Sequence, residues 1–393
     1  MESIITHKQR IKITLIAQTR LYGATCITAL IKHYPIPRFA HIIDKLVRVE
    51  YNKMARTADK ARLSAYKHGI VLSMLRIAKI DTSKSIWDES PLKGITQTML
   101  DFCLDCIKTS KESYILNNTL EVINYLLNNY ADDDLLWDDL DAYWNELSLN
   151  MTNITIGSGV DSSKVSSLST SLSCLAILYR VRPQQTEKAF IEGSKDYISI
   201  LRKFLSSGDP AIRGSACILF SEIVGSTMFA QREFKGITLS EIVNELSESF
   251  KERLYLVKKS ACTALGTCLN ACMHYAHGEE FRELSVQIVT TLLGTNAEDY
   301  WVVKVEVARI LSGIDYGTLI GYSKSMFTVQ DQALDFILEL LESNDPKIRN
   351  RILFYLYLFH LFHQFLYLSF QFNIFNHIIL YVFIFYSHID LFN

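Results

Sequence analysis

The sequence predicts an all-α fold in which pairs of antiparallel helices stack into a solenoid. Four basic residues, Arg213, Lys258, Lys304 and Arg349, follow one another at intervals of 45, 46 and 45 residues, each directly after an apolar residue. The chain also has few helix breakers, with 6 prolines and 16 glycines among its 393 residues. A repeat of about 40 to 47 residues that holds two helices is typical of HEAT-type solenoids.

The best-preserved repeat consists of two amphipathic stretches joined by a short turn. Their apolar residues recur at helical spacing, which predicts two helices with one buried face each. The apolar positions are Tyr197, Ile198, Leu201, Phe204 and Leu205 in the first stretch, and Ile212, Ala216, Leu219, Phe220 and Ile223 in the second. In the turn, Gly208 ends the first helix, Asp209 is suited to cap the second, and Pro210 fits its first position, where no amide donor is needed.

The same turn pattern returns one hundred and thirty-six residues later at Asp345-Pro346, again with an arginine four residues after the aspartate. The spacing places carboxylate and guanidinium one helical turn apart. Because an exposed pair of this kind contributes only about 0.3 to 0.5 kcal/mol, we assign the pair to the register of the turn and not to catalysis.

Less regular helix pairs are predicted upstream. The expected helices are Ile11 to His33, Ala40 to Val49, Arg56 to Ile80, and a pair that begins at Ser90-Pro91 and ends near Leu126. The segment from Asn150 to Lys164 is rich in Thr, Asn, Gly and Ser and predicts a loop, where we place the main domain boundary. The predicted organisation is residues 1–130, N-terminal helix pairs; 131–164, an acidic helix and a Ser/Gly-rich linker; 165–350, regular repeats; and 351–393, an anomalous hydrophobic tail.

An acidic run extends from Asp132 to Asp141, and its Leu136, Leu140, Tyr143 and Trp144 share one helical face. One interpretation is a partner-binding helix that docks into a basic apolar groove. The alternative is a helix packed on the solenoid with its carboxylates in water. The aspartates lack the alternate spacing of a calcium-binding loop.

Composition and motifs predict a protein without an enzymatic role. A net charge of −2 argues against nucleic acid as a partner, because nucleic-acid binders usually carry a strongly basic face. The pairs Cys103 and Cys106, and Cys268 and Cys272 with His274 and His277, are candidates for redox or zinc chemistry, but their spacing and helical context favour buried core thiols. No phosphate-binding glycine loop, nucleophile elbow or His-Glu-x-x-His pair occurs. We expect no catalytic, cofactor-binding or metal-binding residues and no cofactor.

Several phrases resemble the N-terminal HEAT region of the huntingtin family, in the same order and with similar spacing. They are Tyr197 to Ile218, Lys259 to Leu269, Tyr300 to Asp315 and Leu340 to Arg349, with weaker similarity in Met99 to Asn129 and in the helices from Arg10 to Val49. The resemblance extends over residues 10 to 350 or so. It implies a fragment that lacks the glutamine tract of the family's N-terminus and its bridge and C-terminal HEAT domains.

The resemblance also implies a function. It points to a non-enzymatic scaffold in vesicle or organelle transport and in the assembly of autophagy adaptors. The implied partners are a helical co-stabilising protein and adaptors of motors and autophagy, in the cytoplasm and also at the nucleus or on vesicles. The family carries a long disordered insertion where this chain has only Ala131 to Lys164, so regulation at that insertion is not carried over.

The tail differs in character from the repeats. Residues 352–389 contain no Lys, Arg, Asp or Glu and are long enough to span a bilayer. Their histidines and amides, and their lack of Gly, Ala and Pro, are unusual for membrane helices. For this tail we favour the interpretation of translated non-coding sequence or of a truncated gene model. Two alternatives remain for the whole chain. One is a membrane-anchored HEAT-repeat adaptor, if the tail is genuine. The other is an importin-like transport receptor, which predicts acidic inner-face helices over consecutive repeats, whereas the sequence shows only one acidic run.

Overall fold

The fold was analysed in a computed structural model of the chain. The structure describes residues 18–26, 29, 44–57, 59–79, 91–110, 112–130, 140–157, 165–194, 196–226, 233–234, 237–274, 279–295, 300–314 and 324–353. These residues fall into two compact units, Met1–Gly236 (unit 1) and Ile237–Asn393 (unit 2). The division lies within the segment predicted as one array of regular repeats. The assignment of residues 131–164 as an acidic helix and a linker at the main domain boundary stays a prediction.

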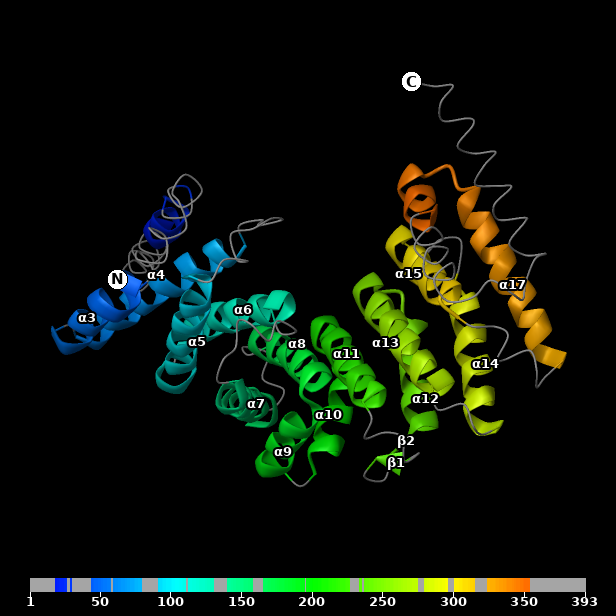
Figure 1. Ribbon diagram of the computed structural model, residues 1–393, viewed down its shortest axis with the longest axis horizontal. Coiled ribbons are helices and arrows are strands. Elements are labelled where there is room, and N and C mark those ends of the chain that lie inside the picture. The colour runs from blue at the N-terminus through cyan, green and yellow to red at the C-terminus, as the bar shows by residue number, and fades with distance from the viewer. Residues whose placement is uncertain are drawn as a thin grey trace, which may run out of the picture. The chain divides into compact units, whose positions relative to one another are not determined.

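Unit 1 is built from helices (Figure 1). Residues 18–26 are α-helical, and a stretch of π-helix, η1 (Lys45–Glu50), lies between them and the labelled α-helices of this unit. The α-helices are α3 (Tyr51–Thr57), α4 (Lys60–Ala78), α5 (Pro91–Thr109), α6 (Ser113–Tyr130), α7 (Leu140–Gly157), α8 (Val165–Val181), α9 (Pro183–Gly193), α10 (Tyr197–Leu205) and α11 (Pro210–Gly225). The all-α prediction is confirmed.

The helices of unit 1 form two layers. The second helices of successive repeats, α4, α6, α8 and α11, pack on one another in chain order. The first helices lie beside them: α5 packs on α6, α7 packs on α8 and α9, and α10 packs on α11. Each of these second helices therefore buries its apolar side against its own partner and against the equivalent helix of the next repeat, as a solenoid requires.

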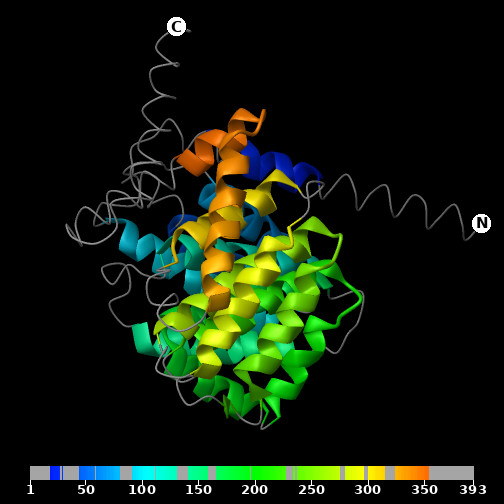
Figure 2. The ribbon, with the colours of Figure 1, turned by 90° about the vertical axis from the view of Figure 1, so that its right-hand side faces the viewer.

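Unit 2 repeats the arrangement with α12 (Leu239–Phe250), α13 (Tyr255–His274), α14 (Glu279–Leu293), α15 (Trp301–Ser312) and α17 (Lys324–Leu341). The second helices α13 and α15 pack together, and the first helices α12, α14 and α17 form the other layer. Figure 2 shows α17 in orange beside the yellow helices α14 and α15. Residues 346–353 are helical and follow α17 in sequence, as the second helix of that repeat would. The described residues also include two short strands that the sequence did not predict, β1 (Glu233–Phe234) in unit 1 and β2 (Ile237–Thr238) in unit 2.

The predicted core of the best-preserved repeat is confirmed. All ten apolar side chains of the two predicted stripes in α10 and α11 are buried. Asp209 caps α11 as expected, since its Oδ1 accepts from the backbone amides of Ala211 and Ile212 at 2.8 and 3.2 Å. Pro210 occupies the first turn of the helix.

The arginine of this turn binds a different group from the one its spacing suggested. The Arg213 guanidinium donates to the backbone carbonyl of Ser207, across the turn. The same contact recurs one hundred and thirty-six residues later, where Arg349 donates to the carbonyl of Ser343. Both carbonyls lie in the turn after a first helix, where backbone acceptors lack helical partners. The half-buried arginine therefore fixes the turn through the backbone.

The loop predicted from Asn150 is wrong for residues 150–157, which form the last two turns of α7. The threonines that suggested a loop are buried in this helix. Thr155 donates to the carbonyl of Met151 at 2.8 Å and lies 3.0 Å from the Ser171 hydroxyl on α8. At Thr152 the helix meets Gly193 of α9, where an added Cβ would lie only 2.7 Å from Thr152 Cγ2. Close packing on neighbouring helices overrides the low helix propensity of these residues.

A second glycine allows close approach within unit 2. A Cβ at Gly266 of α13 would lie 2.8 Å from both Cγ1 and Cδ1 of Ile310 on α15. We expect Gly266→Ala to lower the free energy of unfolding by about 1 to 3 kcal/mol, because Ile310 must leave its packed position. Gly69→Ala in α4 is the matched control, since no atom lies within 4 Å of its added Cβ. It should stabilise the chain by roughly 0.5 to 1 kcal/mol. Urea denaturation of both variants measures the difference, and equal effects would contradict the close packing.

Candidate functional site

Polar contacts join the second helices of successive repeats. In unit 1, the Ser215 hydroxyl on α11 lies 3.0 Å from that of Ser169 and 3.1 Å from that of Ser173, both on α8. At the other end of the same two helices, Arg180 and Glu222 form an ion pair at 3.9 Å. Lys79 and Glu121 join α4 to α6 in the same way, at 3.0 Å. These contacts lie at the edge of the apolar core and fix how far one helix slides along the next.

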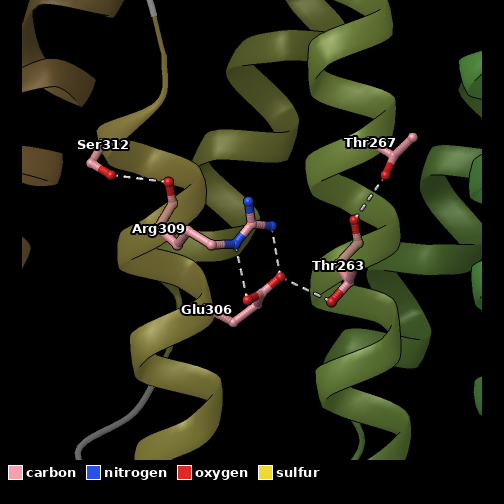
Figure 3. A network of polar contacts seen from close by, with 5 residues as sticks. All are labelled: Thr263, Thr267, Glu306, Arg309 and Ser312. Atoms are coloured by element: carbon pink, nitrogen blue, oxygen red, sulfur yellow. Dashed lines mark hydrogen bonds and ion pairs between the residues drawn. The ribbon is translucent and has the colours of Figure 1, made fainter. Parts of the chain in front are cut away.

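Unit 2 has a corresponding network between α13 and α15 (Figure 3). The Glu306 carboxylate accepts two bonds from the Arg309 guanidinium, at 2.8 and 3.1 Å, and one from the Thr263 hydroxyl at 3.0 Å. Burial acts to raise the pKa of Glu306, but the bonds from Arg309 and Thr263 outweigh it, and the pKa lies below its ordinary value. The carboxylate is thus held charged and directed at the neighbouring repeat.

Charge is segregated between the two layers of unit 2. The described charged side chains of the first helices α12, α14 and α17 are acidic, apart from Arg282. They are Glu241, Glu245, Glu248, Glu280, Glu283, Asp331, Asp335 and Glu339. The described charged residues of the second helices are basic, apart from Glu306. We call α13, α15 and residues 346–353 the basic layer. Their described charged side chains are Lys258, Lys259, Lys304, Arg309, Lys347, Arg349, Arg351 and Glu306.

Apolar side chains are exposed where α13 and α15 begin. Tyr255 and Tyr300 occupy the same position in successive repeats, and their ring centroids lie 4.9 Å apart with an interplanar angle of 41°. Tyr300 is 60% exposed, and Leu254 and Leu256 are about half exposed. We call these four residues the aromatic edge. A cluster of large exposed apolar groups beside charged residues is a common feature of protein interaction sites.

Unit 1 contains a buried carboxylate of a different kind. Glu187 of α9 is 5% exposed and accepts hydrogen bonds from the hydroxyls of Tyr179 and Tyr197, each at 2.8 Å. The rings of both tyrosines stack on Phe190. Burial, followed by the charge of Glu187, raises the pKa of both phenols. The cluster ties α8, α9 and α10 together and offers no open side to a ligand.

The cysteine candidates lie in the core. Cys103 and Cys106 of α5, and Cys268 and Cys272 of α13, are buried and carry free thiols. Burial raises the pKa of Cys106 and of Cys272 to about 12, which disfavours the thiolate needed for redox or metal chemistry. His277 lies outside the described residues. Among the part of the chain that the structure describes, no group of three His, Cys, Asp or Glu side chains is placed to hold a metal ion.

The acidic run and the tail fall largely outside the described residues. Of the face predicted for the acidic run, Trp144 is only 1% exposed, and the Tyr143 hydroxyl donates to Asp101 of α5 at 2.6 Å. Neither aromatic residue is therefore an exposed anchor for a partner, and the interpretation of a packed helix is the better one for these two residues. Residues 354–393 are not described, and none of the helices that are described is long and apolar enough to cross a membrane.

Two surface features of unit 2, the segregation of charge and the aromatic edge, were not identified from the sequence. The charge segregation becomes visible only when acidic and basic residues are sorted by first and second helix, and the sequence analysis counted charge over the whole chain. The aromatic edge has a clear signal, because Tyr255 and Tyr300 are 45 residues apart and precede the basic residue of each repeat. The repeat length was derived from the basic residues alone, and the tyrosines before them were not considered.

Comparison with known proteins supports the resemblance stated above. Residues 198–351 match the family model described as "Huntingtin, N-terminal HEAT". Huntingtin from Takifugu rubripes is 23% identical over 184 residues, which cover 40% of this chain and 6% of that protein. The resemblance to the huntingtin N-terminal HEAT region is confirmed for this segment, and the chain corresponds to a small part of its curated relative.

Similar solved structures include helical-repeat proteins. A designed armadillo repeat protein has a TM-score of 0.43 at 13% identity, with coverage of 65% of this chain and 98% of that one. The karyopherin Kap121p, in a structure with the SUMO protease Ulp1p, has a TM-score of 0.41 at 13% identity, with coverage of 85% and 31%.

The Glu306 network predicts a measurable coupling between two repeats. We expect Glu306→Ala to lower the free energy of unfolding by about 1 kcal/mol, because Arg309 and Thr263 lose their shared acceptor. The loss stays small because the guanidinium is partly exposed and can form hydrogen bonds with water instead. In a double-mutant cycle with Thr263→Val, the two losses should not add. Thr267→Ala is the control, since Thr267 bonds only to a carbonyl of its own helix. Additive losses at Glu306 and Thr263 would show that the contact does not join the helices.

A buried histidine predicts a pH dependence of stability. His68 of α4 is 8% exposed, and its Nδ1 accepts from the Arg20 guanidinium at 2.9 Å. Burial, followed by the charge of Arg20, lowers its pKa to about 4.

Because the unfolded chain binds this proton near pH 6.5, the stabilisation is complete above that pH and is lost as the pH falls towards 4. The loss should be at most about 1.4 kcal/mol per pH unit. Chemical denaturation from pH 7 to 4 should therefore give a shallower profile for His68→Gln than for the unmodified chain. Parallel profiles would mean that the pKa of His68 is the same in the folded and the unfolded chain.

Proposed function

We propose that this chain, in which residues 198–351 match the N-terminal HEAT family of huntingtin, is a non-enzymatic scaffold that binds other proteins. The observation that supports this most directly is the repeated helix pair. Each unit stacks such pairs and presents the outer sides of several equivalent helices as one extended surface. The titratable clusters described above are buried or engaged in contacts between helices, which suits a structural role better than catalysis.

The finer functions come from the resemblance. Huntingtin-like proteins suggest roles in vesicle or organelle transport and in the assembly of autophagy adaptors, in the cytoplasm, with nuclear or vesicle-associated pools. The proposed partners are a helical co-stabilising protein and adaptors of motors and autophagy. These roles are proposals, because the match covers 6% of the curated relative.

One observation favours a second candidate. An importin-like transport receptor would carry acidic inner-face helices over consecutive repeats, and acidic residues do recur in the first helices α12, α14 and α17. Such a receptor would bind basic peptides, whereas a scaffold of the first kind is held in stable complexes. The membrane-anchored alternative depends on residues 352–389, which lie almost entirely outside the described part of the chain.

The scaffold proposal predicts a stoichiometric complex in the cell. The full chain, isolated from cells at its native level of expression, should appear in native mass spectra in a complex with one or more other proteins at a fixed ratio, because a scaffold acts by holding its partners. A control preparation with Leu265→Asp, which places a charge in the core of α13, should lose partners whose binding requires folded repeats. A chain recovered only as a free monomer would contradict the proposal.

A further inference from the structure

We propose that the basic layer and the aromatic edge of unit 2 together bind an acidic amphipathic segment of a partner protein. The inference rests on the proposed scaffold function and specifies the partner for one surface. Its starting point is the segregation of charge: α13, α15 and residues 346–353 are basic, while the first helices of the same unit are acidic.

The basic side chains of this surface are accessible. Lys259, Lys347 and Arg351 are exposed, and the Arg309 side chain is 44% exposed although it holds Glu306. Glu306 is the one acidic side chain described in the basic layer, and its two oxygens are already occupied by Arg309 and Thr263. An approaching carboxylate therefore meets a field of positive sign. The acidic first helices repel the same partner, so that orientation as well as attraction is specified.

The aromatic edge supplies the apolar half of the site. Leu254 directly precedes α13, whose first residues are Tyr255 and Leu256. Tyr300, the N-cap of α15, lies against Tyr255. Arg253 is a further exposed basic residue in the turn directly before α13. Lys251 of the same turn is paired with Glu248 at 2.6 Å, and Glu252 lies between the two basic residues, so this turn adds little net positive charge. In sequence, Glu298 and Asp299 precede Tyr300; they lie outside the described residues and would oppose part of the positive field at this end.

The chemistry of the edge selects a peptide over other acidic ligands. Leucine side chains offer nothing to a phosphate backbone, and the two tyrosine rings already contact each other. Nucleic-acid surfaces combine basic residues with aromatic faces open to bases. A helix with carboxylates on one side and leucine or aromatic residues on the other satisfies both halves of this surface. Because the charged groups are exposed, binding should weaken as salt is added.

The test uses the full-length chain and a short synthetic peptide with glutamate on one helical face and leucine and tryptophan on the other. Binding is measured by fluorescence anisotropy at low salt. The double variant Lys259→Glu/Lys347→Glu should lower the affinity about tenfold, and so should Leu256→Ser/Tyr300→Ser. The matched controls are Lys188→Glu/Lys203→Glu for charge and Ile191→Ser for exposed apolar area, all on exposed positions of unit 1. The controls should leave the affinity unchanged.

Three results would overturn the proposal. The first is equal binding by a peptide with glutamine in place of glutamate. The second is an equal loss of affinity in the matched control variants. The third is tighter binding of single-stranded DNA or of vesicles with phosphatidylserine, lost in the Lys259→Glu/Lys347→Glu variant, which would assign the surface to a polyanion. If the peptide fails to bind while the native complex of the full chain persists, the surface assignment fails and the scaffold function stands.

Discussion

The contact between equivalent helices of successive repeats is the constraint on which the structure depends. A single helix pair leaves an apolar side uncovered, and only the next pair can cover it. In unit 1 this requirement produces the succession α4, α6, α8 and α11, and in unit 2 the pairing of α13 with α15. Apolar packing supplies most of the stabilisation, while serine, threonine and ion-pair contacts between the same helices fix their register.

The first and second helices of the repeats can therefore present different residues to solvent. A helix that is packed on both its partner and its neighbour has a narrow outer side left for recognition, and the residue types on that side are free to vary without loss of the core. Unit 2 uses this freedom to separate charge, with acidic first helices and basic second helices. A scaffold that binds proteins through repeats needs such a difference between its faces, because helix geometry alone is the same in every repeat.

Periodicity predicted the features that depend on local chemistry. The stripes of α10 and α11 and the cap at Asp209 follow from spacing and from the preferences of Asp and Pro at a helix start. Features that depend on neighbours were not predictable in the same way. The threonines of α7 lie within a helix because Ser171 bonds to Thr155 and because Gly193, which has no side chain, leaves room for Thr152. The acceptor of Arg213 is a backbone carbonyl, which a pattern of side chains cannot identify. The basic layer was hidden because its charge is cancelled by the first helices in any sum over the chain.

Hydrogen exchange of the full chain, resolved along the sequence by mass spectrometry, tests the repeat architecture most directly. If second helices are covered on two sides, protection should peak in α4, α6, α8, α11, α13 and α15 and fall in the turns between them, with a period close to the repeat length. Similar protection throughout the chain, or rapid exchange in α13 and α15, would contradict an architecture in which successive second helices stabilise one another.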